Sequence, residues 1–204
     1  KRIGADQTLA ERAALISKSD LITDMVGEFA DLQGIMGRYY AIEDGEHPDV
    51  AEAQFEQYLP RFSGDDVPAT AVGATLAISD KLDTIVGIFS IGQQPSGSRD
   101  PFALRRASLG VLRILINRAI DLDLNDAINI AGNQLKLDNK ALELIRKQVL
   151  AYVLERFKSW YKEEGLLPEI FLSVAALDLS NPLDIDSRVK AVSRFASLPE
   201  SQDL

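Results

Sequence analysis

The sequence has 204 residues, of which 46% are hydrophobic and 26% are charged, and its formal net charge is −9. This composition is typical of a globular protein and excludes a disordered or fibrous chain. The negative balance argues against binding nucleic acid through overall charge, and the absence of cysteine excludes disulfide bridges and thiolate metal sites.

Apolar residues recur every three or four positions along most of the chain, which predicts helices, and no alternating run is long enough for a sheet. We therefore predict an all-α fold. The expected helices span residues 7–26, 31–42, 48–58, 68–89, 101–120, 124–134, 139–163, 168–178 and 186–197.

The sequence has no signal peptide and no apolar run that approaches the length of a membrane span. Together with the lack of cysteine, this favours a cytoplasmic protein with no membrane partner. The chain begins at Lys1 without an initiator methionine and ends with LPESQDL, so we expect an internal piece of a longer protein. Within it we expect one helical domain over residues 1–120 and an additional helical layer over residues 121–204.

The segment 43–66 is strongly acidic, with eight carboxylates and Arg61 as its basic residue. His47, the sole histidine of the chain, lies here in a turn before Pro48. A metal site needs further ligands, and no second histidine or cysteine exists, so we interpret His47 as a solvated turn residue. Asp65 and Asp66 are interpreted as caps or solvated groups.

Several aromatic residues in the first third of the chain fall at helical spacing or beside turns. Core packing is the favoured interpretation, and base stacking on RNA is the alternative. These residues are Phe29, Tyr39, Tyr40 and Phe62.

Residues 78–117 contain two largely apolar helical patterns joined by a Gly/Ser/Pro-rich loop, and each pattern carries a narrow polar stripe. The first stripe contains Asp80 and Asp83, and the second contains Arg106 and Arg113. Charges within apolar helices are costly unless they are paired or used. One interpretation is a structural ion-pair network in which Asp80 or Asp83 binds Arg106. The other is that these arginines face RNA phosphates.

The segment 99–118 has five arginines and one aspartate, so an anionic partner is best sought there. The candidate RNA-binding residues are Arg99, Arg105, Arg106 and Arg113. We expect Arg99 and Arg105 to be the most accessible, because they lie nearest the loop. Asp100 is predicted to cap the following helix, with Pro101 at its first position.

In the last third of the chain, Gly165 is predicted to end one helix and Pro168 to begin the next. Asn181-Pro182 marks a further break, after which Asp184 or Asp186 is expected to cap the last helix.

Three blocks of the sequence closely resemble the beta subunit of the bacterial two-subunit glycyl-tRNA synthetase. They are KSDLITDMVGEFADLQGIMGRYYA (18–41), ISDKLDTIVGIFSIG (78–92) and GSRDPFALRRASLGVLRIL (97–115). The likeness extends more weakly through FKSWYKEEG (157–165) and RVKAVSRF (188–195), so it covers most of the chain.

The resemblance implies an internal HD-domain-like helical bundle with additional C-terminal helices, leading toward an anticodon-binding domain. It implies tRNA(Gly) and the synthetase alpha subunit as partners. Glycine activation, with its ATP and Mg²⁺, is expected to belong to the alpha subunit. No cofactor is expected in this piece.

Catalytically active HD phosphohydrolases hold a divalent metal with a His-Asp dyad and a later aspartate. The corresponding positions here are Ser17 and Lys18, so both dyad ligands are absent, whereas Asp80 matches the later aspartate. One carboxylate cannot hold a catalytic metal, and Lys18 would place a positive charge where the ion would lie. The resemblance therefore predicts a degenerate metal site.

Three functions remain open from the sequence. The favoured one is an RNA-contacting helical module of a ligase without a catalytic centre of its own. The alternatives are a purely structural scaffold between domains or subunits, and a metal-dependent HD phosphohydrolase with an unusual site.

Overall fold

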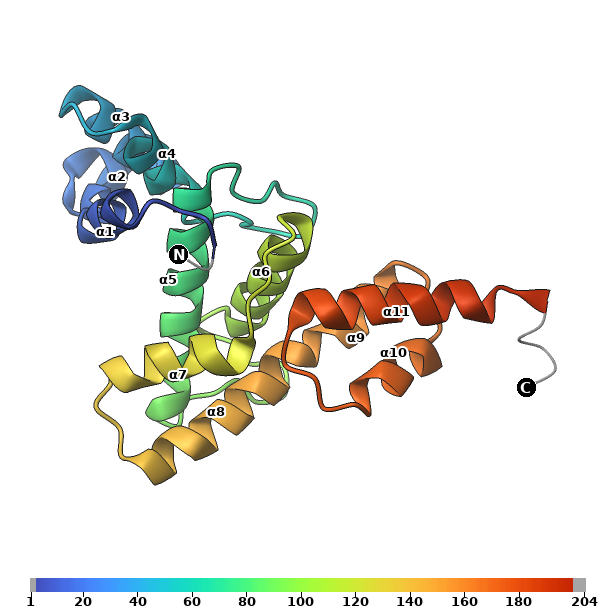
Figure 1. Ribbon diagram of the computed structural model, residues 1–204. Coiled ribbons are helices and arrows are strands. Elements are labelled where there is room, and N and C mark those ends of the chain that lie inside the picture. Colours follow the sequence, from blue (N-terminus) through green and yellow to red (C-terminus); the bar gives the residue numbers. More distant parts are fainter. Residues whose placement is uncertain (1–2, 200–204) are drawn as a thin grey trace. The chain divides into compact units, whose positions relative to one another are not determined.

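The computed structural model describes residues 3–199, and the two ends on which the expectation of an internal piece rests lie mostly outside that range. The helices in chain order are α1 (Gln7–Leu15), the 3₁₀ turn η1 (Ser19–Ile22), α2 (Asp24–Glu28), the 3₁₀ turn η2 (Ala30–Leu32), α3 (Ile35–Glu43), α4 (Pro48–Glu56), α5 (Ala71–Ser90), α6 (Leu104–Asn117), α7 (Leu124–Gln134), α8 (Asn139–Leu154), α9 (Arg156–Glu163), α10 (Pro168–Ala175) and α11 (Pro182–Ala196) (Figure 1). Residues 3–199 contain no strand, which confirms the all-α class. The likeness to HD domains stays a prediction.

The chain forms two compact units that divide between Leu82 and Asp83, inside α5. The division at residue 120 between a helical domain and an additional helical layer stays a prediction. The second half of α5 belongs to the later unit because its side chains pack there: the Phe89 ring lies edge-on to Tyr152 of α8, with 5.2 Å between centroids. Both halves of α5 are apolar, so the sequence pattern does not show that they belong to different units.

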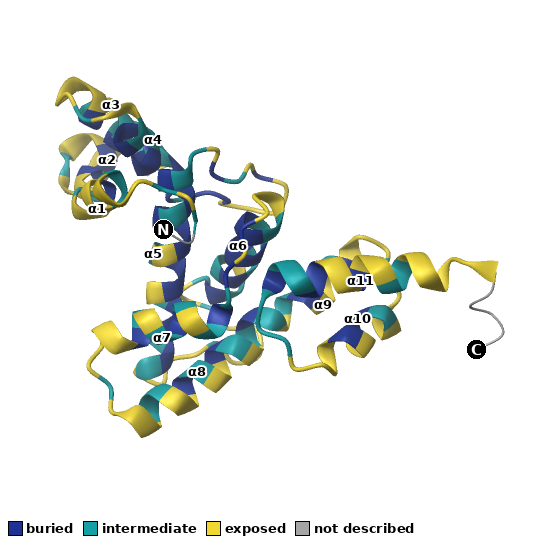
Figure 2. Ribbon diagram, viewed as in Figure 1, coloured by how far each residue is buried: buried dark blue, intermediate teal, exposed yellow. Residues whose placement is uncertain are grey.

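The first unit is built on small apolar side chains from α1, α4 and the first half of α5. Ala13, Val50, Ala53, Val72 and Leu76 form its buried cluster. Small side chains allow these helices to approach closely. Figure 2 shows the buried residues on the inward faces of α4 and α5, and the exposed residues on the outer faces of α1 and α3.

The second unit has larger core residues. Leu112, Ile114 and Leu115 of α6 are fully buried, as are Val149 of α8 and Phe157 of α9. Phe157 stacks on Tyr161 at 5.3 Å between ring centroids, so this aromatic pair lies in the core of the unit.

Two predicted helices are interrupted in the structure. The segment 7–26 breaks after α1, because Lys18 adopts a left-handed conformation with φ 60° and a 3₁₀ turn follows. The segment 139–163 divides into α8 and α9 at Glu155. The Glu155 carbonyl accepts a hydrogen bond from the amide of Lys158, three residues later, at 3.1 Å. Periodicity alone cannot detect such breaks, since the apolar spacing continues through both.

The last helix begins four residues earlier than predicted. Asn181 caps α11 by accepting bonds from the Leu183 and Asp184 amides, and Pro182 occupies the first turn. Asp184 and Asp186 are therefore not the cap. Asp186 is buried instead, where it accepts a hydrogen bond from the Tyr161 hydroxyl at 3.0 Å. The predicted end near Gly165 and start at Pro168 are confirmed.

Crossing a bilayer needs a long, apolar helix, and within residues 3–199 none has that character.

Candidate RNA interface

The loop before α6 is held in place by the first residues of the helix. The Asp100 carboxylate accepts bonds from the amides of Leu104 at 2.8 Å and Arg105 at 3.0 Å. The Arg105 guanidinium donates to the Gly97 carbonyl at 2.5 Å. The Asp100 side chain therefore accepts amides of the first helical turn, although the N-cap residue is Ala103 and not Asp100 as predicted. The helix begins at Leu104, and Pro101 lies in a turn before it.

The four candidate arginines differ in exposure. Arg99 and Arg106 are exposed, whereas Arg105 and Arg113 are partly buried. Arg105 is occupied by the loop carbonyl, and Arg113 also interacts with another group of the protein. Arg99 and Arg106 are therefore the side chains best placed to meet an external anion, which corrects the expectation that Arg105 would be among the most accessible.

Arg118 follows the last residue of α6 and is also exposed. The buried face of the helix consists of apolar residues, among them Val111 and Leu112. The exposed basic groups therefore lie on α6 (Arg106), in the loop before it (Arg99) and directly after its last residue (Arg118). The buried apolar face fixes the backbone of the helix, so less backbone order has to be gained when these arginines contact phosphates.

The positions that the resemblance assigns to a degenerate HD site, Ser17, Lys18 and Asp80, lie in the first unit. Lys18 pairs through its ammonium with the Asp80 carboxylate, and the Ser17 hydroxyl donates to the Ala14 carbonyl at 2.8 Å. The carboxylate that the resemblance aligns with a metal ligand is thus bonded to a lysine of the same chain. A positive charge of Lys18 at this place was expected from the sequence, and the direct ion pair with Asp80 forms at the left-handed turn that interrupts the first predicted helix.

Lys81 lies beside this pair and is buried, with 8% of its surface exposed. Its ammonium donates to the Gln57 carbonyl at 3.0 Å. Burial lowers the pKa of Lys81 to about 8; the Asp80 carboxylate counteracts this shift, and the Lys18 charge adds to it. Burial likewise raises the pKa of the nearby Tyr58 hydroxyl. Two cations and one carboxylate make this region unsuited to a divalent metal.

Asp83, on the same helix, is exposed, as is Arg106. Two of the three members of the predicted ion-pair network are therefore exposed to solvent. The pairing of Arg106 with Asp80 or Asp83 stays a prediction.

Within the part of the chain that the structure describes, no three His, Asp or Glu side chains are grouped to hold a metal ion. A cavity of about 330 Å³ lies among α8, α9, α10 and α11. Apolar side chains such as Leu154 and Phe171 form most of its wall, and its charged lining residues are Glu155 and Asp178. This lining offers no nucleophile with an adjacent base.

Core packing was favoured for Phe29, Tyr39, Tyr40 and Phe62; Tyr40 is partly buried, but the other three are exposed, so for them this interpretation is wrong. Phe29, Tyr39 and Phe62 are 56%, 52% and 58% exposed. Asp65 was interpreted as a cap or a solvated group; it is 7% exposed and therefore not solvated, and it binds Arg61 at 2.9 Å. Arg61 is the basic residue of an acidic segment and directly precedes Phe62. A single arginine among carboxylates was a signal in the sequence for a local ion pair such as the one with Asp65.

The comparisons with known proteins agree with the resemblance. A family model described as the glycyl-tRNA synthetase beta subunit matches residues 1–176. The glycine–tRNA ligase beta subunit of Marinobacter nauticus is 53% identical over 205 residues, which cover 99% of this chain and 29% of the relative. The beta subunits of Pseudomonas fluorescens (strain Pf0-1) and Photobacterium profundum are 53% and 52% identical over 100% of this chain and 30% and 29% of their own lengths.

The chain therefore spans less than a third of the curated relatives that it matches. At this identity and coverage, the family predicted from the three sequence blocks is confirmed. This chain belongs to the glycyl-tRNA synthetase beta subunit family.

Proposed function

We propose that this chain contributes tRNA recognition and positioning to ATP-dependent ligation of glycine to tRNA(Gly), and that it has no catalytic centre of its own. Family membership supports the ligase context and an alpha-subunit partner. In this proposal the alpha subunit activates glycine with ATP and Mg²⁺ in the cytoplasm. The degenerate HD positions, where Lys18 binds Asp80, support the non-catalytic role.

The observation that carries the proposal is the exposure of Arg99, Arg106 and Arg118 around α6 in a chain whose net charge is −9. A negatively charged protein that binds a polyanion must gather its cations locally, because its overall field is repulsive. The segment 99–118 is where they are gathered. The acidic segment 43–66 would disfavour phosphates elsewhere.

The test measures the affinity of the assembled two-subunit synthetase for tRNA(Gly) over a range of salt concentrations. Arg99→Ala and Arg106→Ala should each weaken binding and reduce the slope of log K against log salt by about one, the loss of one phosphate contact. Glycine activation without tRNA should be unchanged. Arg188→Ala is the matched control, because Arg188 is an exposed arginine already paired with Asp184 at 2.9 Å. Unaltered affinity and slope in both α6 variants would contradict the proposal.

A further inference from the structure

Five residues of the first unit alternate aromatic rings with guanidinium groups. The Arg38 guanidinium lies 5.5 Å from the Tyr39 ring centroid and 5.4 Å from that of Phe55. The Arg61 guanidinium lies 5.6 Å from the Phe55 centroid and 5.8 Å from that of Phe62. We call Arg38, Tyr39, Phe55, Arg61 and Phe62 the arginine–aromatic cluster. α3, α4 and the turn after α4 supply its members.

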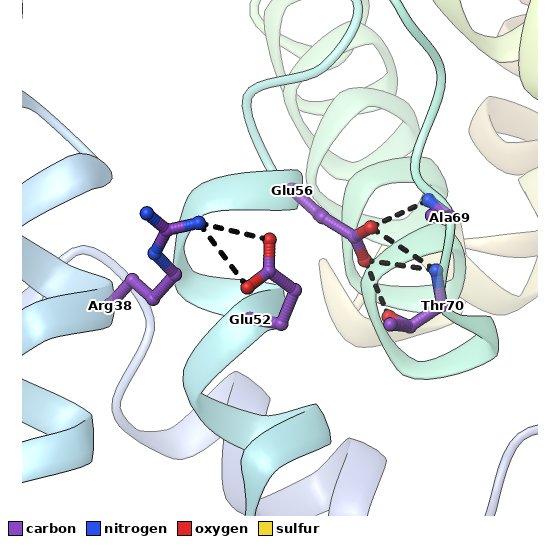
Figure 3. Close-up of polar contacts among 5 residues, drawn as sticks. All are labelled: Arg38, Glu52, Glu56, Ala69 and Thr70. Carbon is purple, nitrogen blue, oxygen red and sulfur yellow. Dashed lines mark hydrogen bonds and ion pairs between the residues drawn. The ribbon is translucent and has the colours of Figure 1, made fainter.

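Carboxylates fix both guanidinium groups. Glu52 binds Arg38 at 3.3 Å, as Figure 3 shows, and Asp65 binds Arg61 at 2.9 Å. The same Asp65 carboxylate also accepts the Arg61 amide at 2.8 Å. The two positive charges are thereby balanced and their side chains ordered. The cluster therefore presents planar faces to solvent with little net attraction for phosphate.

The outer rings of the cluster remain in contact with water. Tyr39 is 52% exposed and Phe62 is 58% exposed, although each has a guanidinium near its ring. Ordered aromatic and guanidinium planes at a surface are the groups on which proteins stack unpaired nucleic acid bases. Because Phe55, Arg61 and Phe62 belong to the acidic segment 43–66, a neutral base is a better ligand here than a phosphodiester.

We propose that the arginine–aromatic cluster binds unpaired bases of RNA, which stack on its two exposed rings, Tyr39 and Phe62. This inference rests on the proposed function, because the RNA it would receive is the tRNA bound by the synthetase. It adds a second kind of contact: the α6 arginines hold phosphates, and the cluster holds bases. The two kinds differ in their dependence on salt.

The experiment uses the assembled synthetase and measures the dissociation constant for tRNA(Gly) at several salt concentrations. Tyr39→Ala and Phe62→Ala should each weaken binding by about ten-fold, the usual loss for one stacked base. The salt slope should stay that of the wild type, because no phosphate contact is removed. Tyr39→Phe keeps the ring and should bind like the wild type. Arg106→Ala, measured in parallel, should change the slope.

Phe29→Ala is the matched control, since Phe29 is 56% exposed in the same unit and outside the cluster. Thermal unfolding checks that every variant is folded. Wild-type affinity in Tyr39→Ala and Phe62→Ala, with the Arg106→Ala effect intact, would overturn the stacking site and leave the proposed function standing. An equal loss in Phe29→Ala, or a loss of subunit assembly instead of RNA affinity, would overturn it as well. Wild-type behaviour of all variants, Arg106→Ala included, would overturn both proposals.

Discussion

The Glu56 carboxylate is buried, with 2% of the residue exposed, and it supplies the bonds that begin α5. It accepts the Ala69 amide at 2.5 Å, the Thr70 amide at 3.1 Å and the Thr70 hydroxyl (Figure 3). Thr70 in turn accepts the Gly73 amide at 2.9 Å. The amide dipoles at a helix start favour a carboxylate there. These hydrogen bonds therefore offset the free-energy cost of burying the Glu56 charge.

Gly73 leaves the space that this carboxylate needs. A Cβ atom at position 73 would lie 1.8 Å from the Glu56 Oε2 atom. We expect Gly73→Ala to displace the carboxylate and lower the free energy of unfolding by about 3 kcal/mol, as for a lost charged hydrogen bond. Urea denaturation measures this.

Gly87→Ala is the control in the same helix, because a Cβ there meets no described atom within 4 Å. It should leave stability unchanged or raise it by up to about 1 kcal/mol. Equal effects of the two substitutions would contradict the steric explanation.

Lys81 makes stability depend on pH. Its pKa falls from the ordinary 10.5 to about 8 through burial, so between these values the unfolded chain binds more protons than the folded chain. The free energy of unfolding should therefore rise with pH across this window. Lys81→Met removes this rise. Its stability relative to the wild type should fall by about 3 kcal/mol between pH 8 and pH 10.5.

Chemical denaturation at a series of pH values provides the measurement, and other titrating groups cancel in the difference between variant and wild type. Lys147→Met is the control, because the Lys147 side chain is 70% exposed and pairs with Glu143 at the surface. A pH-independent difference for Lys81→Met would show that the amine is not desolvated in the folded chain.

Among the elements, α11 shows how a cap is decided by geometry between several candidates. Asn181, Asp184 and Asp186 all stand near its start, and Asn181 accepts the two free amides. Asn181→Ala should lower the free energy of unfolding by about 1 kcal/mol. Asp184→Ala removes an exposed pair with Arg188 and should cost only a few tenths of a kcal/mol. Thermal denaturation distinguishes the two, and the reverse order of effects would identify Asp184 as the cap.

The α8–α9 segment shows what apolar spacing can establish. Ile145, Val149, Val153 and Phe157 recur at helical intervals, and all four are buried. On the outer face of the helix, Glu143 pairs with Lys147 at 3.1 Å, four residues apart. The break at Glu155 changes only the backbone bonding, so the side-chain pattern carries no sign of it.

For the whole molecule, the positions of the charged segments matter more for binding an anionic partner than the net charge of −9 does. The acidic segment 43–66 lies in the first unit, and the arginines of 99–118 lie in the second. In the first unit, many carboxylates serve internal bonds: Glu46 binds Arg12, Glu52 binds Arg38 and Glu56 caps α5. The acidic composition therefore reflects local structure as well as an effect on partners.

The sequence by itself determined the helical class, the family, most helix positions and the location of the arginine-rich segment. These follow from local periodicity and from long, specific blocks of residues, which need no knowledge of distant contacts. Only the tertiary structure decided that Lys18 binds Asp80, that Arg105 holds its own loop, and that Arg38 and Arg61 meet Phe55. Such pairings join side chains far apart in the chain or separated by turns, and a turn such as that at Lys18 redirects a side chain without altering the apolar pattern around it.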